Sequence, residues 1–472
     1  MNKQDSKSSI LILLLLNAWL VGCVNDAATA ALCAPSTGGI LLAPTAAFAT
    51  DPDLSQPGEA ALAGGSSPCG NGTVTPVANV PTQFVATDVV NLTLDMADQT
   101  LVETAVGDDM LAAAWLDGED VVVALSRGGS HFQVRRVDRG NDVSLVFSTV
   151  NRLHMAYEQD GQIYYRAADQ GIHPAETPFQ SHVGFGTNPQ VTLDGRNWAH
   201  IIYEDSGTIW HAMHLYDIYW HIQPLGSGYN PIVLTLPVND ENLDFALTYQ
   251  SGNEVHIAVY GMTLLRQPGW VTVSSIPLAD APLGPVQLHS ALDAEDDRWF
   301  VASWVSEPMT TTVPITTTVP ITPTPMIPIH QVQAAWSSDG GSSWSPPAVM
   351  VENYEMSVGY TGAIGPNAYP LITPTTDPPS VSFVYVYESG NPPPNTTFQR
   401  YGRSHMTVCT LGTTDCTDPP GLPLLPRDVV RPTTNLAVTA DPLNPNRALL
   451  TWDAYQTDVI NKDVYTTYLV LR

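Results

Sequence analysis

The densest group of residues able to bind a ligand is an aromatic and histidine segment at 210–221. Tyr219 and Trp220 fall in or just after a turn, where aromatic rings can stack on a sugar or contact a protein, so we predict them as ligand contacts. A packing role is the alternative. His211 and His214 lie on a predicted strand and point to opposite faces, which argues against a shared metal ion.

Other residues that could do chemistry are fewer. The acidic turn at 293–297 has the oxygen ligands that calcium prefers, but a solvated loop is the stronger interpretation. The chain has no cysteine and histidine spacing typical of zinc sites, no phosphate-binding loop and no G-x-S-x-G segment. We therefore predict no metal and no cofactor, and the catalytic residues, if any, stay unassigned.

One turn has a specific pattern. Ser337, Asp339, Gly340, Gly341 and Trp344 match the motif S-x-D-G-G-x-[ST]-W. This segment resembles the Asp-box (BNR repeat) of bacterial sialidases and related β-propellers. A carboxylate in such a turn can accept backbone hydrogen bonds, and glycine permits positive φ, so Asp339 is predicted to be structural. The resemblance implies a propeller fold with these turns on its outer rim.

The sialidase reaction needs more than this motif. The resemblance implies three arginines on the substrate carboxylate, the first in an Arg-Ile-Pro segment, with a tyrosine nucleophile, a glutamate and an acid/base aspartate. The chain lacks Arg-Ile-Pro, and its first arginine is Arg127. Arg166, Arg298 and Arg400 cannot be assigned as a triad from spacing. We therefore predict a non-catalytic module that binds a glycan or an extracellular protein, with a diverged exo-sialidase as the alternative.

A repeated strand supports this fold. A short apolar run ending in an aromatic residue recurs seven times, at spacings near the about 40–50 residues of a four-stranded blade. The copies are Leu111–Trp115, Leu153–Tyr157, Ala199–Tyr203, Val255–Tyr260, Phe300–Trp304, Val381–Tyr385 and Ala448–Trp452. Most are followed by a Gly/Asp turn and a second apolar run, which is typical of a β-hairpin.

Such hairpins cannot bury both faces alone, and stacking around an axis buries them. We predict an all-β propeller of about seven four-stranded blades, with six or eight as alternatives. The last unit lacks an outer strand, which the segment 84–90 can supply. The predicted domain is 79–472, with a Thr/Pro-rich surface insertion at 307–329 whose prolines exclude a sheet interior.

The amino terminus indicates export. Two lysines precede an apolar run that is too short for a permanent membrane helix and is typical of a signal peptide at 1–22. The run ends in Leu20-Val21-Gly22-Cys23, which resembles the lipobox of bacterial lipoproteins. That resemblance implies lipidation of Cys23 and a membrane anchor at the cell surface. An ordinary signal peptide cut after Ala30, giving a secreted protein, is the alternative.

Composition agrees with an exported protein. The net charge is −28, which makes nucleic acid an improbable partner. Residues 23–78 are rich in Ala, Gly, Pro and Thr and are predicted to be a flexible tether. With Cys23 lipidated, four cysteines remain. Cys409 and Cys416 enclose a short loop and are predicted to form a disulfide, whereas a bond between Cys33 and Cys69 has weaker support.

Overall fold

The computed structural model describes part of the chain. The described residues are 84–86, 90–92, 99–128, 131–215, 219–236, 243–262, 268–293, 295, 297–306, 330–352, 361–373, 378–390, 401–416, 422–423, 431–441, 444–455 and 462–471. They all belong to the compact unit Pro76–Arg472. The predicted signal peptide, Cys23, Cys33, Cys69, the tether, the Thr/Pro-rich insertion and Arg400 lie outside them. No helix among the described residues is long and apolar enough to cross a membrane.

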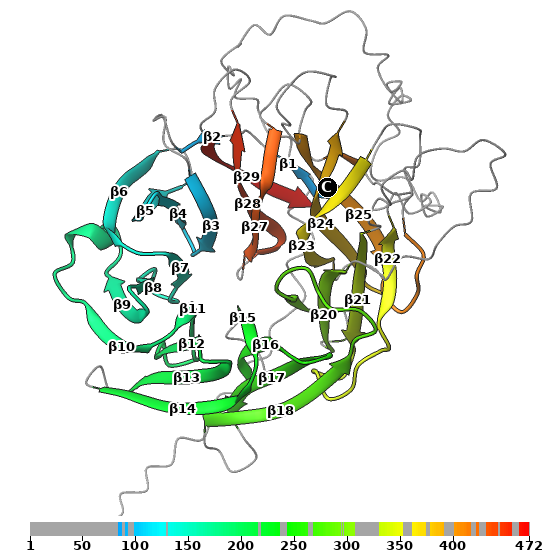
Figure 1. Cartoon of the computed structure of the whole chain (residues 1–472), viewed down its shortest axis with the longest axis horizontal. Helices are drawn as coiled ribbons and strands as arrows, with labels where there is room; N and C mark the ends of the chain where they lie inside the picture. Colours follow the sequence, from blue (N-terminus) through cyan, green and yellow to red (C-terminus); the bar gives the residue numbers. More distant parts are fainter. Residues whose placement is uncertain are drawn as a thin grey trace, which may run out of the picture. The chain divides into compact units, whose positions relative to one another are not determined.

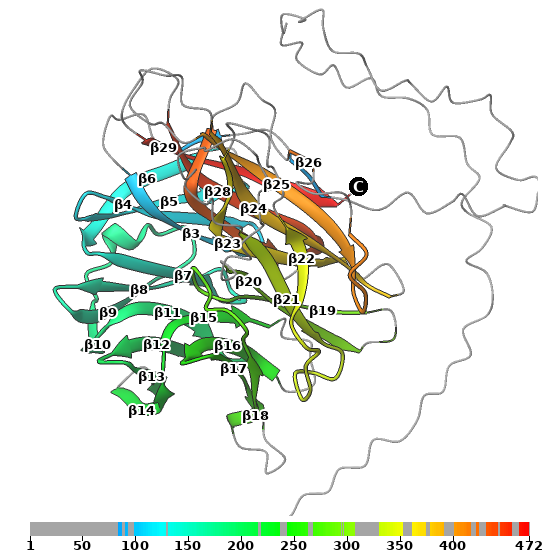
Figure 2. The ribbon, with the colours of Figure 1, turned by 45° about the vertical axis from the view of Figure 1, so that its right-hand side comes forward.

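Seven antiparallel sheets form a ring, as predicted, and the fold is a seven-bladed β-propeller (Figures 1 and 2). The sheets follow one another in chain order, and the first strand of each lies nearest the axis. The first three blades contain β3 (Gln99–Val106), β4 (Met110–Asp117), β5 (Asp120–Arg127) and β6 (Phe132–Arg139); β7 (Asp142–Phe147), β8 (Leu153–Gln159), β9 (Gln162–Ala168) and β10 (Ser181–Phe185); and β11 (Thr187–Leu193), β12 (Ala199–Asp205), β13 (Thr208–Leu215) and β14 (Tyr219–Ser227). A 3-10 turn, η1 (Pro174–Glu176), precedes β10.

The next three blades repeat this order. They contain β15 (Tyr229–Thr235), β16 (Leu243–Ser251), β17 (Glu254–Met262) and β18 (Pro268–Pro277); β19 (Gln287–Leu292), β20 (Arg298–Ser306), β21 (Gln331–Ser337) and β22 (Ala348–Glu352); and β23 (Thr361–Thr373), β24 (Ser380–Gly390), β25 (Tyr401–Thr410) and β26 (Leu422–Pro423). The seventh blade contains β27 (Arg431–Asp441), β28 (Asn444–Tyr455), β29 (Lys462–Leu471) and, from the amino-terminal side, β1 (Phe84–Ala86) and β2 (Val90–Asn91).

The ring is closed by the early strands, as the sequence predicted. Both β1 and β2 pair with β29, the last strand of the chain. Leu92 follows directly, donates its backbone N–H to the carbonyl of Val464 (2.8 Å) and is buried. Its side chain packs in a cluster that includes Trp115 of the first blade and Ala437 of the seventh. Leu92 therefore joins the two ends of the propeller.

Apolar clusters between blades hold the ring together. Each of the seven contacts between adjacent sheets contains one. Trp115, Trp304 and Trp452 are the largest fully buried side chains, and each ends the apolar run of a second strand. The repeated aromatic residue thus fills the space between blades, which explains why one hairpin alone could not bury it.

One of the seven repeat copies was predicted wrongly. Six copies are second strands of their blades, but Val255–Tyr260 lies in β17, the third strand of blade four. The equivalent second strand is β16, in which Phe245 begins the run and Tyr249 ends it. Both strands are apolar and end in tyrosine, so the pattern alone could not separate them, and the blade count was unaffected.

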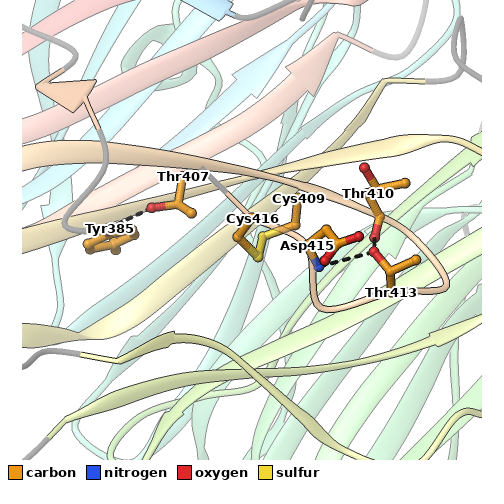
Figure 3. Close-up of a disulfide and its surroundings, with 7 residues drawn as sticks. All are labelled: Tyr385, Thr407, Cys409, Thr410, Thr413, Asp415 and Cys416. Carbon is orange, nitrogen blue, oxygen red and sulfur yellow. Dashed lines mark hydrogen bonds between the residues drawn. A yellow bond between two sulfur atoms is a disulfide. The ribbon is translucent and has the colours of Figure 1, made fainter. Parts of the chain in front are cut away.

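The predicted disulfide between Cys409 and Cys416 is confirmed (Figure 3). Cys409 is buried in β25, and Cys416 forms an isolated bridge opposite it. Between them, Thr413 donates its hydroxyl to the carbonyl of Thr410, and its oxygen accepts the N–H of Asp415. The bond fastens the hairpin that leaves the third strand of blade six.

Candidate functional site

The candidate site is a cavity of about 380 Å³ at the axis of the ring. Its walls come from the inner strands β3, β7, β11, β15, β19, β23 and β27, most of which Figure 1 shows nearest the centre. This volume lies within the range of small-molecule sites in proteins. The cavity therefore has the size and position of a ligand site.

The register of the blades places one layer of residues in this wall. In each blade, the residue just before the recurring aromatic of the second strand pairs with one residue of the inner strand. All seven of these inner-strand residues line the cavity. These partners are Glu103, Ser144, Gln190, Ile232, Gln287, Tyr369 and Ala437. The repeat thus fixes which position of each inner strand belongs to this layer, while the residue type at that position differs from blade to blade. Five of the seven are polar, which is unusual for a site enclosed by sheets.

Two mostly buried polar side chains in this wall, Gln287 and His289, each have a hydrogen-bonding group without a partner among the described residues. Gln287 is 7% exposed, and its amide makes no hydrogen bond to any described residue. His289, at 9% exposed, accepts the backbone N–H of Ile372 at Nδ1 (3.2 Å). That bond leaves the proton on Nε2, which has no partner in the described chain. Neither group is among the fully buried side-chain atoms without a partner, so both are open to the cavity, where water or a ligand can pair with them.

Two neighbouring groups add to this set. Asn367 lines the same cavity, and its Oδ1 is buried without a hydrogen-bond partner among the described residues. Tyr369 donates its hydroxyl to the backbone carbonyl of Leu436, which orients the ring. Burial lowers the pKa of His289 to about 4, so the imidazole is neutral at pH 7. The wall therefore offers neutral donors and acceptors.

Two carboxyl groups dominate the electrostatics of this site. Burial, and next the charge of Asp142, raise the pKa of Glu103 to about 8. Burial also raises the pKa of Asp142 to about 7, in spite of the hydrogen bond from the N–H of Val143 (2.8 Å), and the charge of Glu158 acts in the same direction. Asp142 and Glu158 are paired across β7 and β8. Glu103 lines the cavity, and the charge of Asp142 at the start of β7 acts on it.

Replacing Glu103 with Gln should change how stability depends on pH. Between pH 4.5 and about 8 the unfolded chain ionises this carboxyl while the folded chain keeps its proton, so wild-type stability falls as pH rises. We expect Glu103→Gln to gain about 2 kcal/mol over wild type between pH 5 and pH 8, less than the full linkage value because water can enter the cavity. Urea unfolding at a series of pH values measures the difference.

The control is Asp160→Asn, at an exposed hairpin position whose positive φ of 52° suits asparagine. Its difference from wild type should stay constant over the same pH range. A constant difference for Glu103→Gln as well would contradict the raised pKa.

The cavity contains only some of the residue types that the sialidase resemblance implies for an active site. Tyr369 and Glu103 do share the cavity, and burial and the charge of Glu103 raise the pKa of Tyr369 well above its ordinary value. A proton held this firmly disfavours a tyrosine nucleophile. No arginine is among the described residues of the cavity wall. Arg166 instead donates to Asp138 (3.0 Å) and Arg298 to Ser290 (2.7 Å).

The aromatic and histidine segment lies on the outer part of blade three. Tyr219 and Trp220 begin β14, the outermost strand, and Tyr219 is exposed. Trp220 stacks on His214 and donates its indole N–H to Ser181 (2.8 Å), which is a packing role. Ligand contact by this pair stays a prediction, and the structure does not bring it to the axial cavity.

The two histidines of this segment face different blades. His214 contacts Tyr165 of blade two, whereas His211 lies against Phe245 and Trp270 of blade four. His211 shares a 2.8 Å hydrogen bond with His200. Burial lowers the pKa of His211 well below its usual value. Among the described residues, no group of three or more His, Cys, Asp or Glu side chains could hold a metal.

The glycine turn of blade five is held by its own polar side chains. It connects β21 to β22, and Asp339 accepts hydrogen bonds from the Ser343 N–H (2.9 Å) and the Ser337 hydroxyl (2.7 Å). Gly340 and Gly341 have φ of +69° and +89°, and Trp344 packs against the core between blades four and five. Against the effect of burial, these hydrogen bonds hold the pKa of Asp339 below its usual value. Every contact of the carboxylate is internal to the turn.

Replacing Asp339 with Ala should therefore affect stability alone. We expect a loss of about 1–2 kcal/mol, because the turn N–H and hydroxyl groups lose a charged acceptor. Asp339→Asn keeps one acceptor and should lose less. Urea unfolding measures both values. A weaker ligand affinity of Asp339→Ala at unchanged stability would contradict this assignment.

In the acidic turn at 293–297, the first carboxylate also accepts hydrogen bonds from nearby groups. Asp293 accepts the backbone N–H groups of Glu295 (3.0 Å) and Asp297 (2.8 Å) and the indole N–H of Trp299 (2.8 Å). These bonds, against a burial effect of opposite sign, lower the pKa of Asp293. The Asp293 carboxylate thus accepts hydrogen bonds from the backbone of its own turn and from Trp299.

Glu103, Asp142, Gln287, His289 and Tyr369 were not predicted from the sequence. No fixed spacing marks the layer: the inner-strand residue lies 12 residues before the aromatic in blade one, 17 in blade five and 16 in blade six. The connections between first and second strands differ in length, so the register of each strand pair is needed to find these residues.

No protein-family model matches the chain, and no curated protein matches it in sequence. Solved structures match the fold at low identity. The polysaccharide lyase Uly1 is 8% identical with a TM-score of 0.46, covering 82% of this chain and 100% of that one. The SapL1 lectin in complex with alpha methyl fucoside is 10% identical (TM-score 0.37; 63% and 94% covered). A thermostable family-43 glycoside hydrolase is 11% identical (TM-score 0.33; 71% and 94% covered).

Proposed function

We propose that this propeller is an exported, membrane-anchored module that binds a glycan in its axial cavity without catalysis. The observation that carries the proposal is the pair Gln287 and His289, two mostly buried side chains that present to the cavity hydrogen-bonding groups without a partner among the described residues. Sugars match such a wall because their hydroxyls both donate and accept. The apolar wall residues, such as Val191 and Leu288, can cover the carbon faces of a ring.

A glycan array probed with the mature chain tests this function. Hits should be confirmed by calorimetry with the free oligosaccharide, and Gln287→Leu should weaken binding. Gln133→Ala, at an exposed position of the outer strand β6, is the matched control and should bind like wild type. Binding of the same oligosaccharide that survives Gln287→Leu would place the site elsewhere and overturn the axial assignment.

The anchoring part of the proposal rests on Leu20-Val21-Gly22-Cys23. In cells fed a labelled fatty acid, the wild-type chain should carry the label and sediment with membranes. Cys23→Ser should lose both properties, because several acyl chains are needed for stable attachment. A labelled or membrane-bound Cys23→Ser chain would contradict the lipobox interpretation.

A glycoside hydrolase is the second candidate, favoured by Glu103 and Asp142. A carboxyl with a raised pKa can act as general acid beside a second carboxyl that serves as base or nucleophile. Incubating the array hits with the protein and analysing reducing ends tests this candidate. Cleavage by wild type that Glu103→Gln abolishes would replace the binding proposal, whereas intact oligosaccharide supports it.

A further inference from the structure

The axial cavity has an unbalanced charge composition. Glu103 is in its wall, and neither lysine nor arginine is among the described residues that line it. The whole chain has 46 acidic and 18 basic residues, so long-range fields do not compensate. An anionic sugar such as a sialoside would lie beside a carboxyl group, without a cationic side chain from the described wall to pair with it. This charge composition therefore disfavours negatively charged ligands.

The Glu103 carboxyl has no hydrogen-bond partner among the described residues. The titratable groups that face it or share its wall are Asp142 on β7, Tyr369 on β23 and His289 on β19. Two of these are neutral at pH 7, and Asp142, with Glu158 behind it, can only add negative charge. Nothing in the described wall stabilises an ionised Glu103, so a carboxylate there would need its positive partner from the ligand.

Gln287 supplies an independent observation. Its side chain is more than nine-tenths buried and lines the same cavity, and its amide has no partner among the described residues. An ammonium group has three N–H donors and no acceptor. A carboxylate and an amide oxygen are acceptor types that such a group needs.

We propose that the glycan bound in the axial cavity carries a free amino group, with the ammonium of an unacetylated amino sugar against Glu103. This inference rests on the proposed glycan-binding function and narrows its ligand class. The step is a proton exchange without covalent change. The ammonium takes the place of the proton on Glu103, and that proton leaves to the solvent.

The experiment is calorimetry of the mature chain at pH 7 with two ligands of equal length, the trimer of glucosamine and the trimer of N-acetylglucosamine. We expect the amine trimer to bind at least about tenfold more tightly, since a charge-assisted hydrogen bond contributes about 1.5–3 kcal/mol. Repeating the titration in buffers of different ionisation enthalpy should show release of about one proton per site.

Variants separate the possible outcomes. Glu103→Gln should remove both the preference and the proton release, and Asp160→Asn should change neither. The two trimers could bind wild type with equal affinity, and Gln287→Leu could lose both. That result would overturn the amine inference but would support glycan binding in the cavity. Binding of neither trimer, with other array hits that depend on Gln287, would overturn the inference in the same way. Binding that Gln287→Leu leaves unchanged would overturn both proposals.

Discussion

Replacing Leu92 with Asp is expected to lower the free energy of unfolding by at least about 4 kcal/mol. The side chain is 5% exposed and packs between the first and seventh blades, so the substitution places an unpaired charge where the ring closes. It also removes the apolar contact itself, which for a buried leucine contributes about 2–5 kcal/mol. Urea or thermal unfolding followed by circular dichroism measures the loss.

Leu92→Met is the matched control, because it keeps volume and polarity and should cost less than about 1.5 kcal/mol. Light scattering is a second measurement, since an opened ring exposes the edge of β29 to pairing with another chain. A Leu92→Asp protein as stable and as monomeric as Leu92→Met would mean that the ring does not depend on this closure.

The combined substitution Gln287→Leu with His289→Phe is expected to weaken glycan binding by about 100-fold or more. Each substitution removes a buried group that the ligand would satisfy, and such groups contribute about 1–3 kcal/mol each. His289→Phe also leaves the Ile372 N–H without its acceptor, so the double variant should lose about 1–3 kcal/mol of stability, whereas Gln287→Leu alone should keep the stability of wild type. Calorimetry and urea unfolding on the same samples give both values.

The Gln287→Leu single variant distinguishes a binding role from a packing role, because it should lose affinity while it keeps its stability. If Gln287 only supports the fold, stability and binding should fall together. Gln133→Ala, on an exposed outer strand, should alter neither value. A large loss of stability in Gln287→Leu would contradict the assignment of this side chain to a ligand.

Part of the architecture followed from local chemistry. Runs such as Leu153–Tyr157, joined by a Gly/Asp turn to the next apolar run, are hairpins whatever surrounds them. Their recurrence predicted the number of blades, and the unpaired last unit predicted closure by the segment that contains β1 and β2. The error at Val255–Tyr260 came from two adjacent strands with the same pattern, which only their pairing order separates.

The turn at 337–344 could be predicted for the same reason. Its hydrogen bonds join residues at most four positions apart, so residues that are close in the sequence are also the ones in contact. The cysteine pair is likewise seven residues apart. Short-range features of this kind are encoded locally, and sequence reasoning can find them without knowing the fold.

The axial site depends on contacts of the opposite kind. Glu103, Gln287 and Tyr369 are separated by more than 80 residues from each other, and nothing near each one in the chain indicates a shared wall. Their meeting requires seven blades to close and each inner strand to keep its register with the second strand. The raised pKa values of Glu103 and Tyr369 arise chiefly from burial, a property of the assembled ring. The strands, the turns and the repeat could be predicted from local sequence, because they depend on neighbouring residues. Which polar side chains face the same cavity depends on how the blades assemble into a ring.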